Sequence, residues 1–359
     1  MAYTTIDDPS AHFQTMIFTG DLNDNRALTN DGNSDLQPDL IWFKNRATTN
    51  SHNVLDSTRG VGKKLEGTDT TNAEGDTSTR LTSFDSDGFT VRTDPSVNGN
   101  TNGIVAWQWK ANGGSSNASA AESGSNVAYN FQVNTTSKFM INAYTGTGSS
   151  QTLNLGNHFT PEFLIIKNRS QADSWAVYHH KNTADADTDY LVLDTTAATV
   201  DSADWWEDVD FAADEINLGT NHSVGADGEN YICYAWAGVQ GYSKFGSYTG
   251  NGAQDGTFVY TGFSPAFIMA KRTDAAKNWY IADSKRSPNN VNKAYLVANS
   301  SNAEDTSGDT TDAYFDILSN GFKLRQDFSH LNADGAAHVY MAFAEQPFVT
   351  SSGVPATAR

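Results

Sequence analysis

Three lysines at the ends of matching hydrophobic segments are the first residues whose type and spacing could do chemistry. Each lysine follows a proline by six positions: Pro38 and Lys44, Pro161 and Lys167, Pro265 and Lys271. An ammonium group at the same place in each copy could bind a ligand. Recurrence in all three copies instead favours a structural role, in which each cation closes a strand end against nearby carboxylates. We expect no catalytic role for them.

A histidine pair followed by alternating aspartates raises the question of a metal site. His179 and His180 precede Asp185, Asp187 and Asp189. Neighbouring residues on a strand point to opposite faces, so both imidazoles are not expected to reach one ion. The aspartates resemble the start of a calcium loop, but Tyr190 and Thr196 stand where such a loop needs Gly and Glu. We therefore favour a solvated loop, with no metal and no cofactor.

Two adjacent tryptophans are the best candidates for carbohydrate contact. Trp205 and Trp206 have no counterpart in the other copies and lie among acidic residues, including Asp204 and Asp208. A ring face stacks on the apolar face of a sugar while carboxylates accept hydroxyl bonds. The alternative is that one of the rings packs in the core. The other tryptophans lie in or beside repeated apolar strands and are expected in the core: Trp42, Trp107, Trp109, Trp175, Trp236 and Trp279.

A glycan-cleaving enzyme would need two carboxylates at a defined separation in one cleft. The aspartates and glutamates fall in turn-like contexts, and no copy repeats a carboxylate pair within a strand. The sequence also contains no Gly-x-Ser-x-Gly motif, phosphate-binding glycine loop or Cys/His cluster. We expect a protein without enzymatic activity.

The elements that carry these residues occur three times. Upstream of each Pro-to-Lys segment lies an aromatic-Thr-Gly triplet, and downstream lie a second short strand and an aromatic closing strand after a Gly turn. Asp56, His179 and Asp283 stand at equivalent ends of the second strand. The long period means that each copy should hold its own core. We expect repeats at residues 1–112, 113–240 and 241–349, with a C-terminal tail at 350–359.

The composition indicates an all-β protein. It is rich in Gly, Asn, Asp, Ser and Thr, and only 18% of its residues are charged. Residues 127–134 alternate apolar and polar side chains and should form a hairpin with 139–144. Residues 203–208 could form a single helical turn, and 111–126 read as a flexible linker. We expect three tandem antiparallel β-sandwiches of jelly-roll or concanavalin-like type, arranged in a row.

Net charge and cysteine content exclude several classes of partner. The formal charge of −19 disfavours nucleic acid, since no basic run overrides it. The single cysteine, Cys233, lies in an apolar run and should be buried. The first residues lack the features of a signal peptide, and no stretch is long and apolar enough for a membrane helix. We expect synthesis in a cytoplasm and no membrane insertion.

The repeated motifs resemble a known family. The aromatic-Thr-Gly, Pro-x-[Phe/Leu]-[Ile/Leu]-x-x-Lys and Trp-x-[Val/Ile] units, the residues 86–89, and the ending 342–350 look like a repeat found in structural and tail-fibre-like proteins of marine tailed bacteriophages. The resemblance covers nearly the whole chain. It implies a virion surface protein built of lectin-like β-sandwiches, without enzymatic activity in the repeat.

From this resemblance we expect a tail-fibre or tail-associated component, synthesised in the host cytoplasm, that assembles with other virion proteins and with itself. A homo-oligomer is expected, with a trimer as one form. Contact with a host surface glycan would use the loops around Trp205 and Trp206. The alternatives are a capsid decoration protein and, less favoured, a glycan-cleaving enzyme. Specific recognition is expected where the copies differ: residues 60–79, 180–215, 300–312 and the C-terminal tail.

Overall fold

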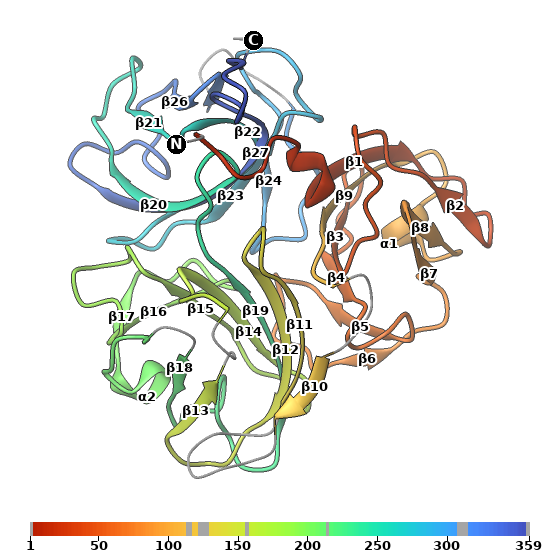
Figure 1. Ribbon diagram of the computed structural model, residues 1–359, viewed down its shortest axis with the longest axis vertical. Coiled ribbons are helices and arrows are strands. Elements are labelled where there is room, and N and C mark those ends of the chain that lie inside the picture. The colour runs from red at the N-terminus through yellow and green to blue at the C-terminus, as the bar shows by residue number, and fades with distance from the viewer. Residues whose placement is uncertain are drawn as a thin grey trace.

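The computed structural model describes residues 3–112, 117–120, 129–154, 158–212, 215–306 and 315–356. The described chain is almost entirely β-structure, as predicted from its composition. Its few helical elements are single turns: η1 (Pro9–Ala11), α1 (Pro95–Asn98) and α2 (Ala203–Trp206). None of the described helices is long and apolar enough to cross a membrane. Figure 1 shows the strands in three groups set around a common centre.

The first group, which we call unit 1, spans residues 13–109. Its larger sheet has the order β1-β9-β3-β4-β5-β6 and its smaller sheet the order β2-β8-β7. The turn at Asp87 and Gly88 joins β7 to β8. The strands are β1 (Phe13–Thr19), β2 (Arg26–Leu28), β3 (Leu40–Asn45), β4 (Asn53–Asp56), β5 (Lys63–Glu66), β6 (Gly75–Asp76), β7 (Leu81–Asp85), β8 (Gly88–Val91) and β9 (Gly103–Trp109).

Unit 2 spans residues 117–236. Its larger sheet has the order β10-β11-β12-β19-β14-β15-β16-β17, and β13 pairs with β18. The predicted hairpin is confirmed, because β11 pairs antiparallel with β12. The strands are β10 (Asn117–Ala120), β11 (Tyr129–Asn134), β12 (Phe139–Thr145), β13 (Gln151–Asn154), β14 (Phe163–Asn168), β15 (Trp175–His179), β16 (Asp189–Val192), β17 (Val200–Asp201), β18 (Glu215–Leu218) and β19 (Asn230–Trp236).

Unit 3 spans residues 243–347. Its larger sheet has the order β20-β27-β22-β23-β24 and its smaller sheet the order β21-β26-β25. The strands are β20 (Ser243–Thr249), β21 (Phe258–Tyr260), β22 (Phe263–Arg272), β23 (Trp279–Asp283), β24 (Leu296–Val297), β25 (Phe315–Leu318), β26 (Gly321–Leu324) and β27 (Ala337–Pro347).

Five strands of each larger sheet follow the same order, so positions can be matched between units. β1-β9-β3-β4-β5 corresponds to β12-β19-β14-β15-β16 and to β20-β27-β22-β23-β24. The three strand lysines sit at the same register, paired with Val105, Ile232 and Val339. The boundaries expected at residues 112, 240 and 349 remain predictions.

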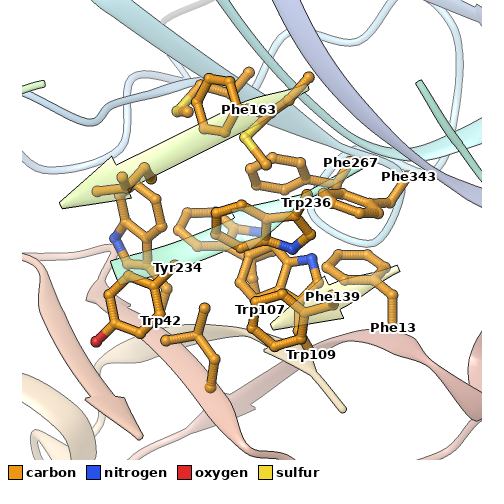
Figure 2. Packing of buried hydrophobic residues seen from close by; sticks show 14 of the residues in the cluster. Phe13, Trp42, Trp107, Trp109, Phe139, Phe163, Tyr234, Trp236, Phe267 and Phe343 are labelled. Atoms are coloured by element: carbon orange, nitrogen blue, oxygen red, sulfur yellow. The ribbon is translucent and has the colours of Figure 1, made fainter. Parts of the chain in front are cut away.

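A buried cluster of hydrophobic side chains joins the three units. Each unit has a cluster of its own, but the fourth and largest cluster takes residues from all three. Figure 2 labels a part of its aromatic members: Phe13, Trp42, Trp107, Trp109, Phe139, Phe163, Tyr234, Trp236, Phe267 and Phe343. Ring contacts cross between units, as in Trp109 against Trp236, whose centroids lie 6.1 Å apart. Each unit thus holds a core of its own, as expected, but the units do not stand in a row, because the shared cluster joins all three around one centre.

Burial on both faces explains the continuous apolar strands. Alternate residues of β14 belong to different clusters: Phe163 and Ile165 to the shared one, Leu164 and Ile166 to the cluster of unit 2. A strand covered on both sides needs apolar residues at successive positions, in place of the alternation of a half-exposed strand. Each larger sheet thus lies between its own smaller sheet and the common centre.

The predicted linker and tail differ from expectation where they are described. Residues 117–120, placed in the linker, form β10 and pair with β11, while 113–116 and 121–126 lie outside the described residues. Residues 350–356 of the predicted tail fold back onto the chain, and the Ser351 N–H donates to Asp7 Oδ1 at 2.6 Å. Both ends of the described chain thus meet. Residues 357–359 lie outside the described residues.

Candidate functional site

The tryptophan pair expected to contact sugar is buried. Trp205 is 5% exposed and Trp206 is fully buried, both within the cluster of unit 2. Trp205 stacks on Tyr190 with a centroid distance of 3.8 Å, and Trp206 packs edge-on against Tyr178. The alternative of a ring packed in the core therefore holds for both, because the α2 turn carries both of them inward.

The two neighbouring carboxylates do lie on the surface. Asp204 and Asp208 are exposed. Asp204 and the edge of Trp205 line a shallow open pocket together with Asn221 and His222. Without an exposed ring face, the carboxylates alone do not form the stacking platform that the sequence suggested.

The strand lysines are fully buried and bond to backbone carbonyls. The acceptors are the carbonyls of Asn45, Thr48 and Asn50 for Lys44 (2.7, 3.0 and 2.8 Å), of Asn168 and Thr71 for Lys167 (2.8 and 3.2 Å), and of Arg272 and Thr196 for Lys271 (2.8 and 3.3 Å). The ammonium groups therefore bond to backbone carbonyls and not to the carboxylates that were expected. Lys167 reaches a carbonyl of unit 1, and Lys271 one of unit 2. Burial lowers the pKa of each lysine to about 8.

The histidine pair also bonds across a unit boundary. Lys181 N–H donates to His179 Nδ1 at 3.0 Å, so Nε2 carries the proton and donates to the Tyr340 carbonyl at 3.1 Å. His180 Nε2 contacts the Phe245 carbonyl at 2.8 Å. The rings lie only 5.6 Å apart. They do not diverge as expected, because β15 ends at His179 and its alternation stops there.

The aspartates after this pair do not join it. Asp185 is exposed, and Asp189 accepts a hydrogen bond from Thr183. Across the described ranges, no group of three or more His, Cys, Asp or Glu lies close enough to hold a metal ion. Cys233 is buried, as expected, and its burial raises the pKa of its thiol.

A buried charge network joins unit 1 to unit 2. Arg59 Nε donates to Asp56 Oδ2 at 2.5 Å, and its Nη1 contacts Glu74 Oε2 at 3.2 Å. Arg169 of unit 2 forms a bidentate pair with Glu74, with both bonds at 2.9 Å. The Tyr234 hydroxyl donates to Asp56 Oδ2 at 2.7 Å. Burial acts to lower the pKa of Arg59, but Asp56, Tyr234 and Glu74 together outweigh it, so the pKa is raised and the charge is kept.

The same network recurs between unit 3 and unit 1. Arg286 donates to Asp283 and, at 2.8 Å, to Glu304 Oε1. Arg46 of unit 1 contacts Glu304 Oε2 at 2.6 Å. The Trp107 indole N–H donates to Asp283 Oδ2 at 3.0 Å. Asp283 matches Asp56, Arg286 matches Arg59, and Trp107 matches Tyr234 by strand register.

The junction between units 2 and 3 uses neutral groups at the same positions. His179 stands where the others have Asp, and Asn182 stands where they have Arg, three residues later. The Thr199 hydroxyl donates to Asn182 Oδ1 at 2.6 Å, and Thr199 N–H donates to the Thr273 carbonyl at 2.8 Å. The matched backbone bonds at the other junctions run from Glu74 to Arg169 (2.9 Å) and from Glu304 to Arg46 (2.8 Å).

At each junction, one side chain of the neighbouring unit matches the hydrogen-bonding needs of the buried residue that it faces. Tyr234 and Trp107 supply donors to the two aspartates. Met341, at the matching position of unit 3, has no such donor, and it stands at the junction where His179 replaces Asp. Complementary changes on two units therefore preserve the hydrogen bonding of each boundary.

A further set of hydrogen bonds between the units lies beside these networks. His52, Trp175 and Trp279 occupy equivalent positions, four residues before Asp56, His179 and Asp283. Trp42 Nε1 donates to His52 Nδ1 at 2.8 Å, so His52 donates from Nε2 to Val297 of unit 3 at 3.0 Å. The two indoles donate to the Gly67 and Val192 carbonyls (3.1 and 2.9 Å). Burial lowers the pKa of His52 to about 3, which keeps it neutral.

Sequence reasoning placed Asp56, His179 and Asp283 at equivalent positions but missed their partners. The signal was present as Asp-x-x-Arg at both 56–59 and 283–286. The acids that complete the networks, Glu74 and Glu304, fall in two of the segments where recognition was expected. Both acids bond across unit boundaries. Residues 307–312 lie outside the described residues, and recognition by these segments remains a prediction.

Comparison with known sequences places the chain in a family. No curated protein matches it. A family model described as a domain of unknown function (DUF7483) matches residues 8–347, which include all three units and every junction residue described above. The chain belongs to this family, the DUF7483 domain of unknown function.

Proposed function

We propose that this protein is a non-enzymatic structural protein on the surface of a bacteriophage particle. One observation carries the proposal: most of the buried polar groups that could do chemistry are bonded to a neighbouring unit. Lys167, Lys271, His179 and the Asp–Arg–Glu networks all bond from one unit to the next, while Lys44 bonds within unit 1. Such a body suits rigid display and contact with other subunits. The phage assignment itself rests on the motif resemblance described above.

The proposal favours assembly over glycan attachment through Trp205 and Trp206. A buried ring cannot present its face to a sugar, and both rings are buried. Homo-oligomer formation is part of the proposal, although the three units of one chain already fill the centre that three separate subunits would otherwise share.

Labelling intact phage particles with an antibody against this protein tests the proposal. Signal on the particle at constant stoichiometry would support it, and its position would distinguish tail from capsid. Absence of the protein from purified particles would overturn it. Release of reducing sugars from host envelope material by the pure protein would contradict the non-enzymatic part.

A further inference from the structure

The outer edge of β20 in unit 3 has no described strand paired beside it and is open at Ser247. Gly250 N–H and the Tyr242 carbonyl bond toward β27. By alternation, the backbone groups of Phe245 and Ser247 point away from it. The Phe245 carbonyl accepts from His180. Within the described chain, the backbone of Ser247 has no hydrogen-bond partner, and its side chain is exposed.

The matching edge of unit 2 is covered by a strand of the chain itself. There β11 pairs with β12, placing Gln132 opposite Ile141, the residue that matches Phe245. In unit 1, the loop at residues 30–34 bonds to the side chain of Gln14 on β1, at 2.9 Å to Ser34 and 3.0 Å to Gly32. Within the described chain, neither β1 nor β20 has a strand paired along its outer edge, so unit 2 shows what an added strand looks like.

The side chains of β11 show what an occupant of such an edge does. Phe131 enters the cluster of unit 2. Gln132, the next residue, points to the neighbouring unit and donates to Ser57 Oγ and Thr58 Oγ1, both at 2.9 Å. An extended strand can therefore close the side of a sandwich and bridge two units at once.

In unit 3, the position beside β20 that corresponds to β11 is a groove of about 690 Å³. Its walls include Phe258 and Tyr260, which are 45% and 47% exposed, unusually open for large rings in this protein. Tyr3 lies at one end and donates to the Gly262 carbonyl at 2.8 Å. The aromatic walls offer apolar area for a side chain placed as Phe131 is in unit 2.

The charged residues of the groove indicate which polar side chain a bound segment would carry. His180 and Lys181 stand where unit 1 has Ser57 and Thr58, and Lys181 is exposed. Lys244 adds a second cation to the groove, while Glu162 lies 3.7 Å from His180. In a chain of net charge −19 this is a locally basic site. A carboxylate in place of Gln132 would meet Lys181.

We propose that the β20 edge binds an extended segment of a different protein, antiparallel to β20, as an added strand. Main-chain bonds to Phe245 and Ser247 supply affinity, and alternate side chains supply specificity. The segment carries an aromatic residue for the wall formed by Phe258 and Tyr260, followed by an acidic residue for Lys181. On docking, its backbone takes over the Phe245 carbonyl from His180. This inference does not require the phage assignment.

Peptide binding to the intact protein tests the proposal. The probe is a fluorescent peptide with the sequence of residues 129–134 in which Gln132 is replaced by Glu, followed by anisotropy. Ser247→Pro removes the outward N–H without touching the β20–β27 ladder, and proline is tolerated on strand edges. Ser247→Ala is the matched control. We expect Ser247→Pro to weaken binding at least about tenfold, Ser247→Ala to change it less than about twofold, and Lys181→Gln to weaken it several-fold.

Three results would overturn the proposal. They are no saturable binding at millimolar peptide, equal binding by Ser247→Pro with an unchanged circular dichroism spectrum, and saturation of the groove by host envelope oligosaccharide instead of peptide. Concentration-dependent dimerisation that Ser247→Pro abolishes would show a second copy in the groove and would overturn the assignment to a different protein.

Discussion

Trp107 of unit 1 donates its indole N–H to Asp283 of unit 3 across 3.0 Å, within a fully buried junction. The residues are 176 positions apart in the sequence. The bond therefore links the closing strand of the first unit to a strand of the last, and with Arg286 it fixes the Asp283 carboxylate from two sides. The ring of units is closed by such contacts.

Removing the carboxylate from this junction should strongly lower the free energy of unfolding. Asp283→Ala leaves Arg286 and the Trp107 N–H without one acceptor in a buried place, which costs about 3–5 kcal/mol. Chemical denaturation of the variant would measure this loss. Asn182→Ala at the neutral junction is the matched control and should cost only about 1 kcal/mol. Equal losses at the two junctions would contradict the account.

The protein should lose stability in acid through its buried histidines. Burial lowers the pKa of His52 and His179 to about 3, below the unfolded value of about 6.5. The unfolded state therefore binds more protons between these values. The stability contribution is complete above pH 6.5 and declines as the pH falls toward 3, by on the order of 4 kcal/mol for each imidazole.

Melting temperatures measured from pH 7 to pH 4 would follow this loss. His179→Gln keeps an amide donor for the Tyr340 carbonyl but does not titrate, so its curve should be flatter than that of the wild type. An identical pH dependence would exclude His179 as a contributor.

Mildly alkaline pH should increase stability through the strand lysines. Their pKa of about 8 lies below the unfolded value of about 10.4. Between these values the unfolded state binds more protons, so the free energy of unfolding rises with pH. The gain should be on the order of 1 kcal/mol per lysine up to about pH 9.5. Above that, burial raises the pKa of tyrosines such as Tyr234, and the trend reverses.

Urea unfolding at pH 7.5 and pH 9.5 checks the rise. Lys167→Met should remove the contribution of one lysine to this rise in the free energy of unfolding. Substitution of the exposed Lys181 by Met should leave the rise unchanged. A wild-type curve that falls between the two pH values would refute the assignment.

Substitution of the buried tryptophan should act on stability. Trp206→Ala removes a fully buried ring that packs on Tyr178, and this costs about 3–5 kcal/mol. Thermal unfolding measures the cost. Asp204→Ala and Asp208→Ala, at exposed positions of the same loop, should change stability by less than about 0.5 kcal/mol. A stable, folded Trp206→Ala variant would contradict the packing described here.

Local pattern was enough to predict the strands and their matches, but not how the units meet. The Pro-to-Lys segments, the hairpin before residue 144 and the equivalence of Asp56, His179 and Asp283 follow from apolar periodicity and spacing. Partners such as Tyr234 for Asp56 lie 178 positions away, and no local rule identifies them. Trp205 was misplaced for a similar reason: acidic neighbours suggested exposure, while its burial depends on Tyr190 across the unit.

The central claim is that three units of one chain form a single cooperative body around the shared cluster. Differential scanning calorimetry of the whole protein tests it most directly. The account predicts one transition, with equal calorimetric and van't Hoff enthalpies, that Asp283→Ala shifts as a whole to lower temperature. Three separable transitions, of which Asp283→Ala lowers only one, would contradict it.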